Sequence, residues 1–468
     1  MASYKYEALS PQDASFLTAE GPCTPMHIAA AFIAESGPLR TEHGGIDIER
    51  IRAFIGARLH RIPRYRQRLA YTPLRSRPIW VDDNHFSVEY HVRHTALPHP
   101  GSEAQLKGLI GRLSSQPLDR RRPLWELWVI EGLEGGGRFA VVSKVHHCMV
   151  DGISGAELMT VLMSLSPDEV GGSPPPFVPR PAPSARELVA DDLLGLAAGP
   201  MQAGMRVAEL LGAERRGELA QALRGAGDLI ARGLLPASET PLNREIGPHR
   251  RFDYFALDLA RVRALKDKLG GTLNDIVLAT VAGGMRRFLT RRLVDVGGLD
   301  FRVSAPVSVR SSAEQGVVGN RVSAWIVPIP VGEVDPLRRL EHIRATTRRL
   351  KESNQALGAD LLSAVTEWTG MTLLSLGTSF QNIGRPHNLI VTNVPGPQVP
   401  LYLVGAPILE TYPIGPLFQN QAVIVALFSY AGRLFWGLNA DAERMPDLAD
   451  LRADLERAFE ELAALALL

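Results

Sequence analysis

The stretch Val145-His146-His147-Cys148-Met149-Val150-Asp151-Gly152 places two histidines, an aspartate and a glycine at the end of a predicted strand. The preceding residues, Arg138 to Val145, alternate in character and follow the turn Gly135-Gly136-Gly137, which is typical of a β-strand. Because neighbouring strand residues face opposite sides, His147 shares a face with Val145, whereas His146 shares the other face with Lys144. Only one of the two imidazoles can then face a given pocket.

A turn and a helix are predicted after the histidines. Gly152 permits a tight turn, and the residues from Ile153 to Leu165 have the apolar spacing of an amphipathic helix. Asp151 falls at this turn, where a carboxylate can hydrogen-bond an imidazole or a cation and fix the shape of the loop. A neutral histidine is well suited to take a proton from a hydroxyl near pH 7. We therefore predict a positioned general base, and we assign it to His147.

Other interpretations of the same residues stay open at this point. Paired histidines on a strand are often hydrogen-bonded structural groups. A zinc site needs further ligands, and no additional His/Cys cluster stands near His146 and His147, so we predict no metal. Cys148 could serve as a nucleophile, but nothing in the sequence marks it as an activated thiolate, and buried inert cysteines are commoner.

Length and composition indicate a globular protein of two domains. A chain of 468 residues is long for one hydrophobic core. Its 51 lysines and arginines nearly balance 50 acidic residues, so the net charge of +1 gives no electrostatic reason to expect nucleic-acid binding. Two cysteines and a start without a signal-peptide pattern favour the cytoplasm. The uncharged stretches 386–409 and 411–432 are broken by prolines, so neither predicts a membrane-spanning helix.

The order of predicted elements divides the chain into three parts. Strands and helices alternate over residues 1–170 and again over 251–468, so we expect an α/β or α+β class with two domains. Between them, residues 171–250 begin with a proline-rich linker and continue as an alanine- and leucine-rich helical stretch. That stretch has mixed apolar and basic faces, and packing along the two domains is a more common use of such helices than membrane contact. The predicted strands include 26–33, 79–81, 88–92, 123–130, 138–147, 252–259, 301–310, 321–328, 388–393, 422–430 and 434–439.

Several motifs, taken in order, resemble the bacterial wax ester synthase/diacylglycerol acyltransferase family. The first is HHxxxDG at His146 to Gly152, which is shared with a wider superfamily that includes chloramphenicol acetyltransferase and peptide-synthetase condensation domains. The ordered set is more specific and covers nearly the whole chain. Its other members are Leu9-Ser10-Pro11-Gln12-Asp13, Pro123-Leu124-Trp125, Leu242-Asn243, Asn274-Asp275, Pro306-Val307-Ser308-Val309-Arg310, Gly319-Asn320, Asn393-Val394-Pro395-Gly396-Pro397 and Ser429-Tyr430.

The resemblance implies a fold and roles for particular residues. The fold would be two chloramphenicol-acetyltransferase-like domains with a substrate tunnel between them. His147 would be the general base, within a motif completed by His146 and Gly152, and Asp151 would be an orienting residue paired with an arginine. Our candidate for that arginine is Arg310, although a solvated arginine at a strand end is an equally simple interpretation. Asn274 and Asp275 match a second functional motif, but Asn-Asp at a helix start is also ordinary N-cap chemistry.

By the same resemblance, the activity would be transfer of a long acyl chain from acyl-coenzyme A to a lipid hydroxyl, that of diacylglycerol or of a fatty alcohol. Acyl-coenzyme A would be a co-substrate, and no resident cofactor is expected. This substrate class implies peripheral contact with the inner face of a membrane or with a lipid droplet. One departure is Phe418-Gln419-Asn420-Gln421-Ala422, which lacks the family's glycine-rich turn and puts the acceptor preference in doubt. The alternatives are a small polar or carrier-bound acceptor, and a non-catalytic lipid-binding module.

Overall fold

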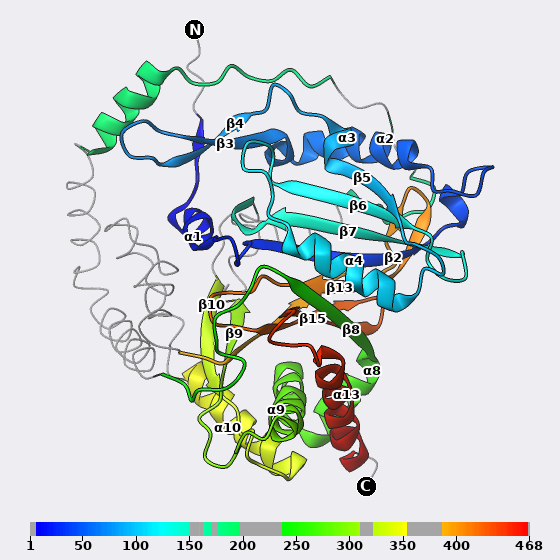
Figure 1. Cartoon of the computed structure of the whole chain (residues 1–468), viewed down its shortest axis with the longest axis vertical. Helices are drawn as coiled ribbons and strands as arrows, with labels where there is room; N and C mark the ends of the chain where they lie inside the picture. The colour runs from blue at the N-terminus through cyan, green and yellow to red at the C-terminus, as the bar shows by residue number, and fades with distance from the viewer. Residues whose placement is uncertain are drawn as a thin grey trace.

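The computed structural model describes residues 6–149, 159, 162–169, 172, 176–196, 236–308, 322–352 and 386–466. Its described part contains a six-stranded sheet in the N-terminal half, another in the C-terminal half, and a three-stranded sheet beside the first (Figure 1). Helices accompany each six-stranded sheet. The expected mixed α/β architecture of two domains is therefore confirmed.

The N-terminal sheet is built around the strand that ends in the histidines. This strand, β7 (Arg138–His146), pairs antiparallel with β2 (His27–Glu35) on one side and with β6 (Trp125–Glu131) on the other. β5 (Val92–Ala96) then adds parallel to β6. The helices of this half are α1 (Pro11–Ala19), α2 (Ile48–Arg58), α3 (Val88–His91) and α4 (Glu103–Ser115). Since β7 is an inner strand with buried side chains on both faces, its end is held from two sides.

A small sheet projects beside this half. It has the order β1 (Glu7–Ala8), β4 (Pro78–Asp82) and β3 (Gln67–Tyr71). A helix over residues 185–196 lies against it, with Leu188 packed on Ile79 and Val81. Part of the stretch predicted as a linker thus packs on the N-terminal half.

The C-terminal sheet has six strands. Their order is β10 (Val322–Pro328), β9 (Arg302–Ser308), β11 (Leu389–Pro395), β14 (Val423–Tyr430), β15 (Arg433–Asp441) and β8 (Arg250–Asp258). Four helices accompany it, and they form the lower part of the molecule in Figure 1. They are α8 (Leu259–Leu269), α9 (Leu273–Arg291), α10 (Pro336–Glu352) and α13 (Leu448–Leu465). Their apolar faces and the sheet share one hydrophobic core.

Two strands cross from the C-terminal half into the N-terminal sheet. β13 (Ala406–Ile414) pairs antiparallel with β2, and β12 (Tyr402–Leu403) pairs with β13 at the sheet edge. The crossing brings Tyr412 onto Tyr254 of β8, with ring centroids 3.9 Å apart. The two halves therefore share a sheet as well as an interface, an arrangement that the sequence did not predict.

Local predictions are confirmed in most places and wrong in a few. Ser10 caps α1, since its hydroxyl accepts a hydrogen bond from the Asp13 amide at 3.1 Å, and α13 begins close after Pro446 as expected. The predicted strand over 88–92 is instead the short helix α3. Ser87 caps that helix by accepting from the Tyr90 amide at 3.3 Å, and the strand starts only at Val92. The cap outweighs the strand preference of the valine and tyrosine in this segment.

The closest approach between the crossing strand and the C-terminal sheet requires a glycine. A Cβ atom on Gly437 of β15 would lie 1.8 Å from the carbonyl oxygen of Pro413 in β13. We expect Gly437→Ala to lower the free energy of unfolding by about 2 kcal/mol or more, because the backbones must separate. Urea unfolding followed by tryptophan fluorescence measures this change.

Gly56→Ala is the matched control for Gly437→Ala. Gly56 lies inside α2, and a Cβ atom there would meet no atom within 4 Å. The better helix propensity of alanine should raise stability by up to about 1 kcal/mol. Equal effects of the two substitutions would contradict a steric contact between β13 and β15.

Candidate active site

The first histidine of the pair is held by hydrogen bonding and charge. His146 is the last residue of β7 and is almost completely buried. The Cys148 amide donates a hydrogen bond to His146 Nδ1 at 3.2 Å, so the neutral ring carries its proton on Nε2. Nε2 lies 3.5 Å from Oε1 of Glu20, at the outer limit of a hydrogen bond, so the attraction is mainly electrostatic. Both ring nitrogens of His146 are therefore directed at protein groups.

Glu20 joins three segments of the chain at this point. It follows α1 directly, and its Oε1 accepts a hydrogen bond from the Met26 amide at 3.1 Å. Its Oε2 accepts from Arg120 Nε at 2.8 Å. Burial alone would raise the pKa of Glu20, but His146, Arg120 and the Met26 amide outweigh it and lower that pKa to about 2. The carboxylate is consequently ionised at neutral pH.

Lys144 and His146 share one face of β7, as strand alternation predicts. His27 lies opposite His146 on β2, so it belongs to this face too. Lys144 Nζ donates to the carbonyl oxygens of Leu113 and Gln116, at 3.2 and 2.9 Å, and so caps the end of α4. Burial, together with Lys144 and His146, holds the pKa of His27 well below its usual value. His27 is therefore neutral at pH 7 and adds no charge beside Glu20.

His147 was predicted to continue the strand, but it leaves the strand and begins a 3₁₀ turn, η4 (His147–Met149). Its amide donates to the Met26 carbonyl at 2.9 Å, and its ring stacks on Phe16 of α1, with centroids 3.7 Å apart and planes 14° apart. His147 keeps partial exposure, while its Nδ1 is buried and has no hydrogen-bond partner among the described residues. The ring is thus fixed by its backbone and by an aromatic face.

Burial controls the charge of His147. Desolvation, with a smaller contribution from neighbouring His146, lowers the pKa of His147 to about 4. The ring is therefore neutral at pH 7, as a general base must be. Cys148, the neighbouring candidate nucleophile, is buried, and burial raises the pKa of its thiol. Cys148 is accordingly a protonated, inert side chain.

The Asn274-Asp275 pair lies at the start of α9, where Thr272 is the N-cap. Asp275 completes a capping box, since its Oδ2 accepts from the Thr272 amide at 2.7 Å, and its Oδ1 accepts from the Thr347 hydroxyl at 2.7 Å. Asn274 is exposed, and its Oδ1 accepts from Asn393 Nδ2 at 2.8 Å. Asp275 therefore has a structural role here, while Asn274 connects two motifs of the C-terminal half.

Three further predicted residues, Asp151, Gly152 and Arg310, lie outside the described residues. The pairing of Asp151 with Arg310 stays a prediction. Conversely, Phe16, Glu20 and Arg120 were not predicted. The one sequence signal for Glu20 was its position shortly before β2, the strand that pairs with β7. Its partner Arg120 lies 100 residues away in the chain, so the sequence could not show that contact.

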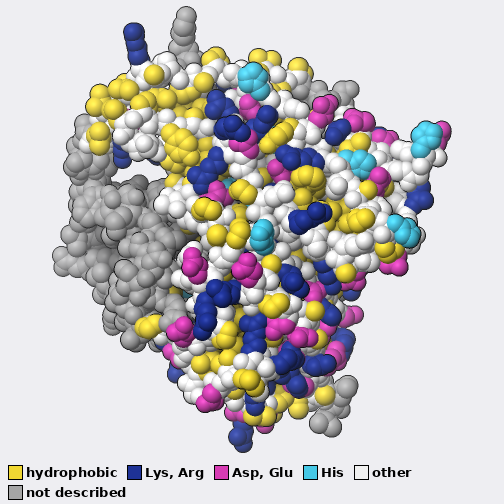
Figure 2. All heavy atoms as spheres, in the orientation of Figure 1, with side chains coloured by type: hydrophobic (Ala, Val, Ile, Leu, Met, Phe, Trp, Pro, Cys, Tyr) yellow, Lys and Arg dark blue, Asp and Glu magenta, His cyan; other side chains and the backbone are white. Residues whose placement is uncertain are grey.

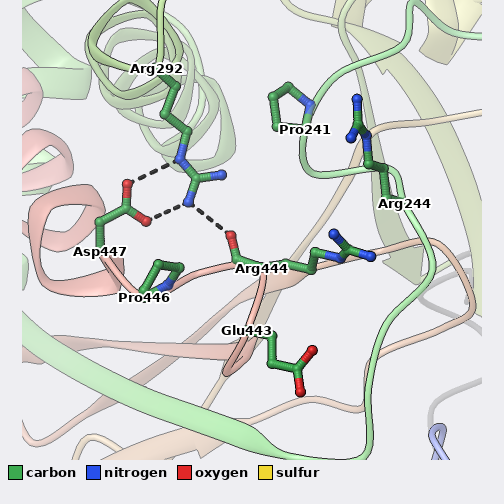
Figure 3. Close-up of a pocket in the computed structure, with 7 residues that line it drawn as sticks. All are labelled: Pro241, Arg244, Arg292, Glu443, Arg444, Pro446 and Asp447. Carbon is green, nitrogen blue, oxygen red and sulfur yellow. Dashed lines mark hydrogen bonds and ion pairs between the residues drawn. The ribbon is translucent and has the colours of Figure 1, made fainter.

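A hollow of about 390 Å³ in the C-terminal half is lined by other residues (Figure 3). Arg292 there donates from Nε to Asp447 at 3.0 Å and from Nη2 to the Arg444 carbonyl at 2.9 Å. Its remaining lining residues are Pro241, Arg244, Glu443 and Pro446. None of the predicted site residues lines this hollow, which is therefore separate from the histidines.

Two family models together match most of the chain. Residues 9–277 match the model of the wax ester synthase/diacylglycerol acyltransferase catalytic domain, and residues 318–463 match the WS/DGAT C-terminal domain. The chain belongs to this family. The WS/DGAT assignment makes the protein an acyltransferase, and the histidine motif lies inside the matched catalytic domain.

Individual relatives cover nearly the whole chain. A candidate diacylglycerol O-acyltransferase of Mycobacterium tuberculosis (strain CDC 1551 / Oshkosh) is 33% identical over 463 residues, which cover 97% of this chain and 90% of that protein. A protein of strain ATCC 25618 / H37Rv, named a probable diacylglycerol O-acyltransferase, is 32% identical over 466 residues, with coverages of 98% and 96%. The WS/DGAT chain is thus similar to these relatives over almost their full length.

Solved structures confirm the fold. The wax ester synthase/diacylglycerol acyltransferase from Marinobacter aquaeolei VT8 aligns with a TM-score of 0.67 and 27% identity, covering 98% of this chain and 100% of that one. The first condensation domain of the calcium-dependent antibiotic synthetase aligns with a TM-score of 0.61 and 17% identity, covering 99% and 97%, and shows the shared fold alone. Among the described residues, no helix has the length and apolar character to span a membrane.

Glu20→Gln tests whether the carboxylate positions the histidines. The amide keeps the shape but loses the charge beside His146 and Arg120, so we expect kcat to fall about tenfold or more with little change in KM. Stability should fall by about 2 kcal/mol, because a buried charge-assisted network is weakened. Steady-state kinetics and thermal unfolding measure the two effects.

Glu49→Gln is the control for the loss of a carboxylate. Glu49 pairs with Arg52 at 2.6 Å on the exposed surface of α2. Exposed ion pairs contribute little to the free energy of unfolding. Activity should therefore be unchanged, and stability should stay within about 0.5 kcal/mol of the wild-type value. A Glu20→Gln enzyme with wild-type kcat would exclude the positioning role.

Proposed function

We propose that this WS/DGAT protein transfers a long fatty acyl group from coenzyme A to the hydroxyl of a lipid alcohol, either diacylglycerol or a fatty alcohol. The observation that carries the proposal is a neutral, partly exposed His147 ring held against Phe16 within the catalytic domain of an acyltransferase family. The names of the Mycobacterium tuberculosis and Marinobacter relatives support these acceptors.

In the proposed mechanism both substrates are bound together, and His147 acts as general base. It takes the hydroxyl proton while the alcohol oxygen attacks the thioester carbonyl carbon. The tetrahedral intermediate then collapses, the C–S bond breaks, and the imidazolium returns the proton to the coenzyme A thiolate. A low pKa makes the imidazolium a strong acid in this second step. No enzyme nucleophile is required, which fits a protonated Cys148.

The other motif residues have supporting roles in this proposal. His146 would hold the turn that presents His147, and Asp151 and Gly152 would shape the loop that follows. Arg310 would pair with Asp151, and Asn274 with its partner Asn393 would orient a substrate or an oxyanion. A tunnel between the halves would exclude water, because hydrolysis of the thioester competes with esterification.

Replacing the proposed base should abolish most of the acyl transfer. His147→Ala should lower turnover by about two to four orders of magnitude without unfolding the protein. The assay is thiol release from palmitoyl-coenzyme A by purified protein, with diacylglycerol, hexadecanol or no acceptor. Acceptor-dependent release that disappears in the variant is the expected result, and the preferred alcohol is identified at the same time.

Two results of this assay would contradict the proposal. Near-normal turnover by folded His147→Ala would exclude the base assignment. Absence of release with every lipid acceptor, from folded wild-type protein, would point to a polar or carrier-bound acceptor, or to lipid binding without turnover.

The pH dependence of kcat/KM should reflect the desolvation of the His147 ring. Since burial lowers its pKa from 6.5 to about 4, the neutral base persists as the pH falls below 6.5 and is lost only as the pH passes through about 4. We therefore expect the acid limb of the profile near pH 4 under conditions where the protein stays folded. An acid limb near 6.5 would indicate that a solvated histidine performs the reaction.

A further inference from the structure

A tight turn over residues 21–24 connects α1 to β2, and the residues at its two ends contact the histidine pair. Thr24 closes the turn, because its amide donates to the Gly21 carbonyl at 3.0 Å and its hydroxyl accepts from the Gly21 amide at 2.9 Å. Glu20, directly before the turn, lies beside the first histidine of the motif, and the Met26 carbonyl after it accepts a hydrogen bond from the second. The position of this turn therefore affects both histidines.

Arg250 reaches the tip of the turn from the other half of the molecule. It is the first residue of β8, which runs beneath α4 at the junction of the two halves (Figure 1). Its side chain is only 2% exposed, and its Nη2 donates a hydrogen bond to the Cys23 carbonyl. The turn that leads to the histidines is thus bound by a side chain of the C-terminal half, which Figure 2 shows as the lower part of the surface.

The other arm of the guanidinium is bound within the C-terminal half. Nη1 of Arg250 donates to the Gly247 carbonyl at 2.7 Å and to the His249 carbonyl at 3.1 Å, and it lies 3.7 Å from Oδ2 of Asp441. A buried guanidinium is stable only where such oxygens surround it. Its planar fork therefore binds the C-terminal half with one arm and the Cys23 carbonyl with the other.

The backbone of Arg250 packs closely on α4. Its amide donates to the Ser115 hydroxyl at 2.8 Å, and a Cβ atom on Gly111 would lie 2.7 Å from the Arg250 carbonyl oxygen. The carbonyls at the end of this same helix bind Lys144, on the face of β7 that also carries His146. The guanidinium therefore approaches the turn from a backbone that is itself fixed against the N-terminal half.

We propose that Arg250 is a positioning residue for acyl transfer, which fixes the turn beside His146 and His147 and so makes their geometry depend on the docked C-terminal half. The inference rests on the proposed function, in which His147 takes the hydroxyl proton. A displacement of about 1 Å in a reacting group can lower the rate by about two orders of magnitude. Both halves are then needed for a competent base, although the histidine motif lies in one of them.

Arg250→Lys tests the proposal in the full-length enzyme. It keeps a positive charge near Asp441, but one ammonium cannot replace both arms of the guanidinium, so the contact with Cys23 should be lost. We expect kcat to fall about tenfold or more while KM stays within about twofold of the wild-type value, because the change acts on the base and not on substrate binding. Arg250→Met keeps much of the bulk, removes every donor and should lower kcat at least as much.

Hydrogen exchange read by mass spectrometry follows the turn without catalysis. The informative peptides contain residues 20–27 and 145–149, which include the amides of Met26 and His147 with their acceptors Glu20 and Met26. In both Arg250 variants these amides should exchange at least about tenfold faster than in wild type, because their acceptors move with the turn. Peptides over residues 138–142, at the opposite end of β7, should exchange as in wild type.

Two control variants separate this contact from other effects. Arg251→Gln removes the neighbouring arginine, which is exposed and donates to the Pro446 carbonyl at 2.9 Å within the C-terminal half. Lys107→Gln removes an ion pair across the same junction, where Lys107 Nζ of α4 lies 2.6 Å from Asp253 of β8. Both variants should keep the wild-type kcat and the wild-type exchange around the histidines.

Three results would overturn the proposal. They are a wild-type kcat in folded Arg250→Lys and Arg250→Met, unchanged exchange of residues 20–27 and 145–149, and an equal loss of kcat in Lys107→Gln, which would assign the effect to docking of the halves in general. If the wild-type protein transfers no acyl group to any acceptor, the proposed function fails. Faster exchange in the Arg250 variants would then still support its hold on the histidine segments.

Discussion

The ionised carboxylate of Glu20, buried beside His146 and Arg120, is the contact on which the candidate site depends. It follows the helix that supplies Phe16, and it binds the amide of Met26, whose carbonyl in turn accepts from His147. One side chain thus connects the aromatic face under His147, the strand beside His147 and the histidine before it. An acid at this place is stable only because cationic groups and an amide surround it.

The two histidines of the motif lie in two different environments. His146 points into a polar interior with His27 and Lys144, where hydrogen bonds and charge fix its position. His147 lies against an aromatic ring, where loss of solvent keeps it uncharged. The proposed general base needs both a fixed geometry and a free lone pair, and the last strand residue and the first residue of the turn meet these needs in two different surroundings.

Sequence reasoning succeeded where the signal is local. The alternation of Lys144 and His146, the cap at Ser10 and the apolar stripe of α13 all follow from neighbouring residues, and the motif order identified the family. Sequence reasoning failed where two interacting residues or strands lie far apart in the chain. Glu20 meets Arg120 and His146 only after the sheet has formed, and nothing near residues 406–414 shows that this strand pairs with β2. The segment 88–91 was misjudged because a four-residue helix depends on its cap and its packing.

The crossing of β13 has a consequence for the order in which the protein becomes active during synthesis. β2 lies between β7 and β13, so the sheet that holds His27 and His146 has an open edge until residues 406–414 have left the ribosome. Nascent chains fold from the N-terminus, and an unpaired strand edge invites aggregation. The nascent N-terminal half therefore has to wait for nearly the whole chain, which suggests a need for chaperone protection of the β2 edge in the cell.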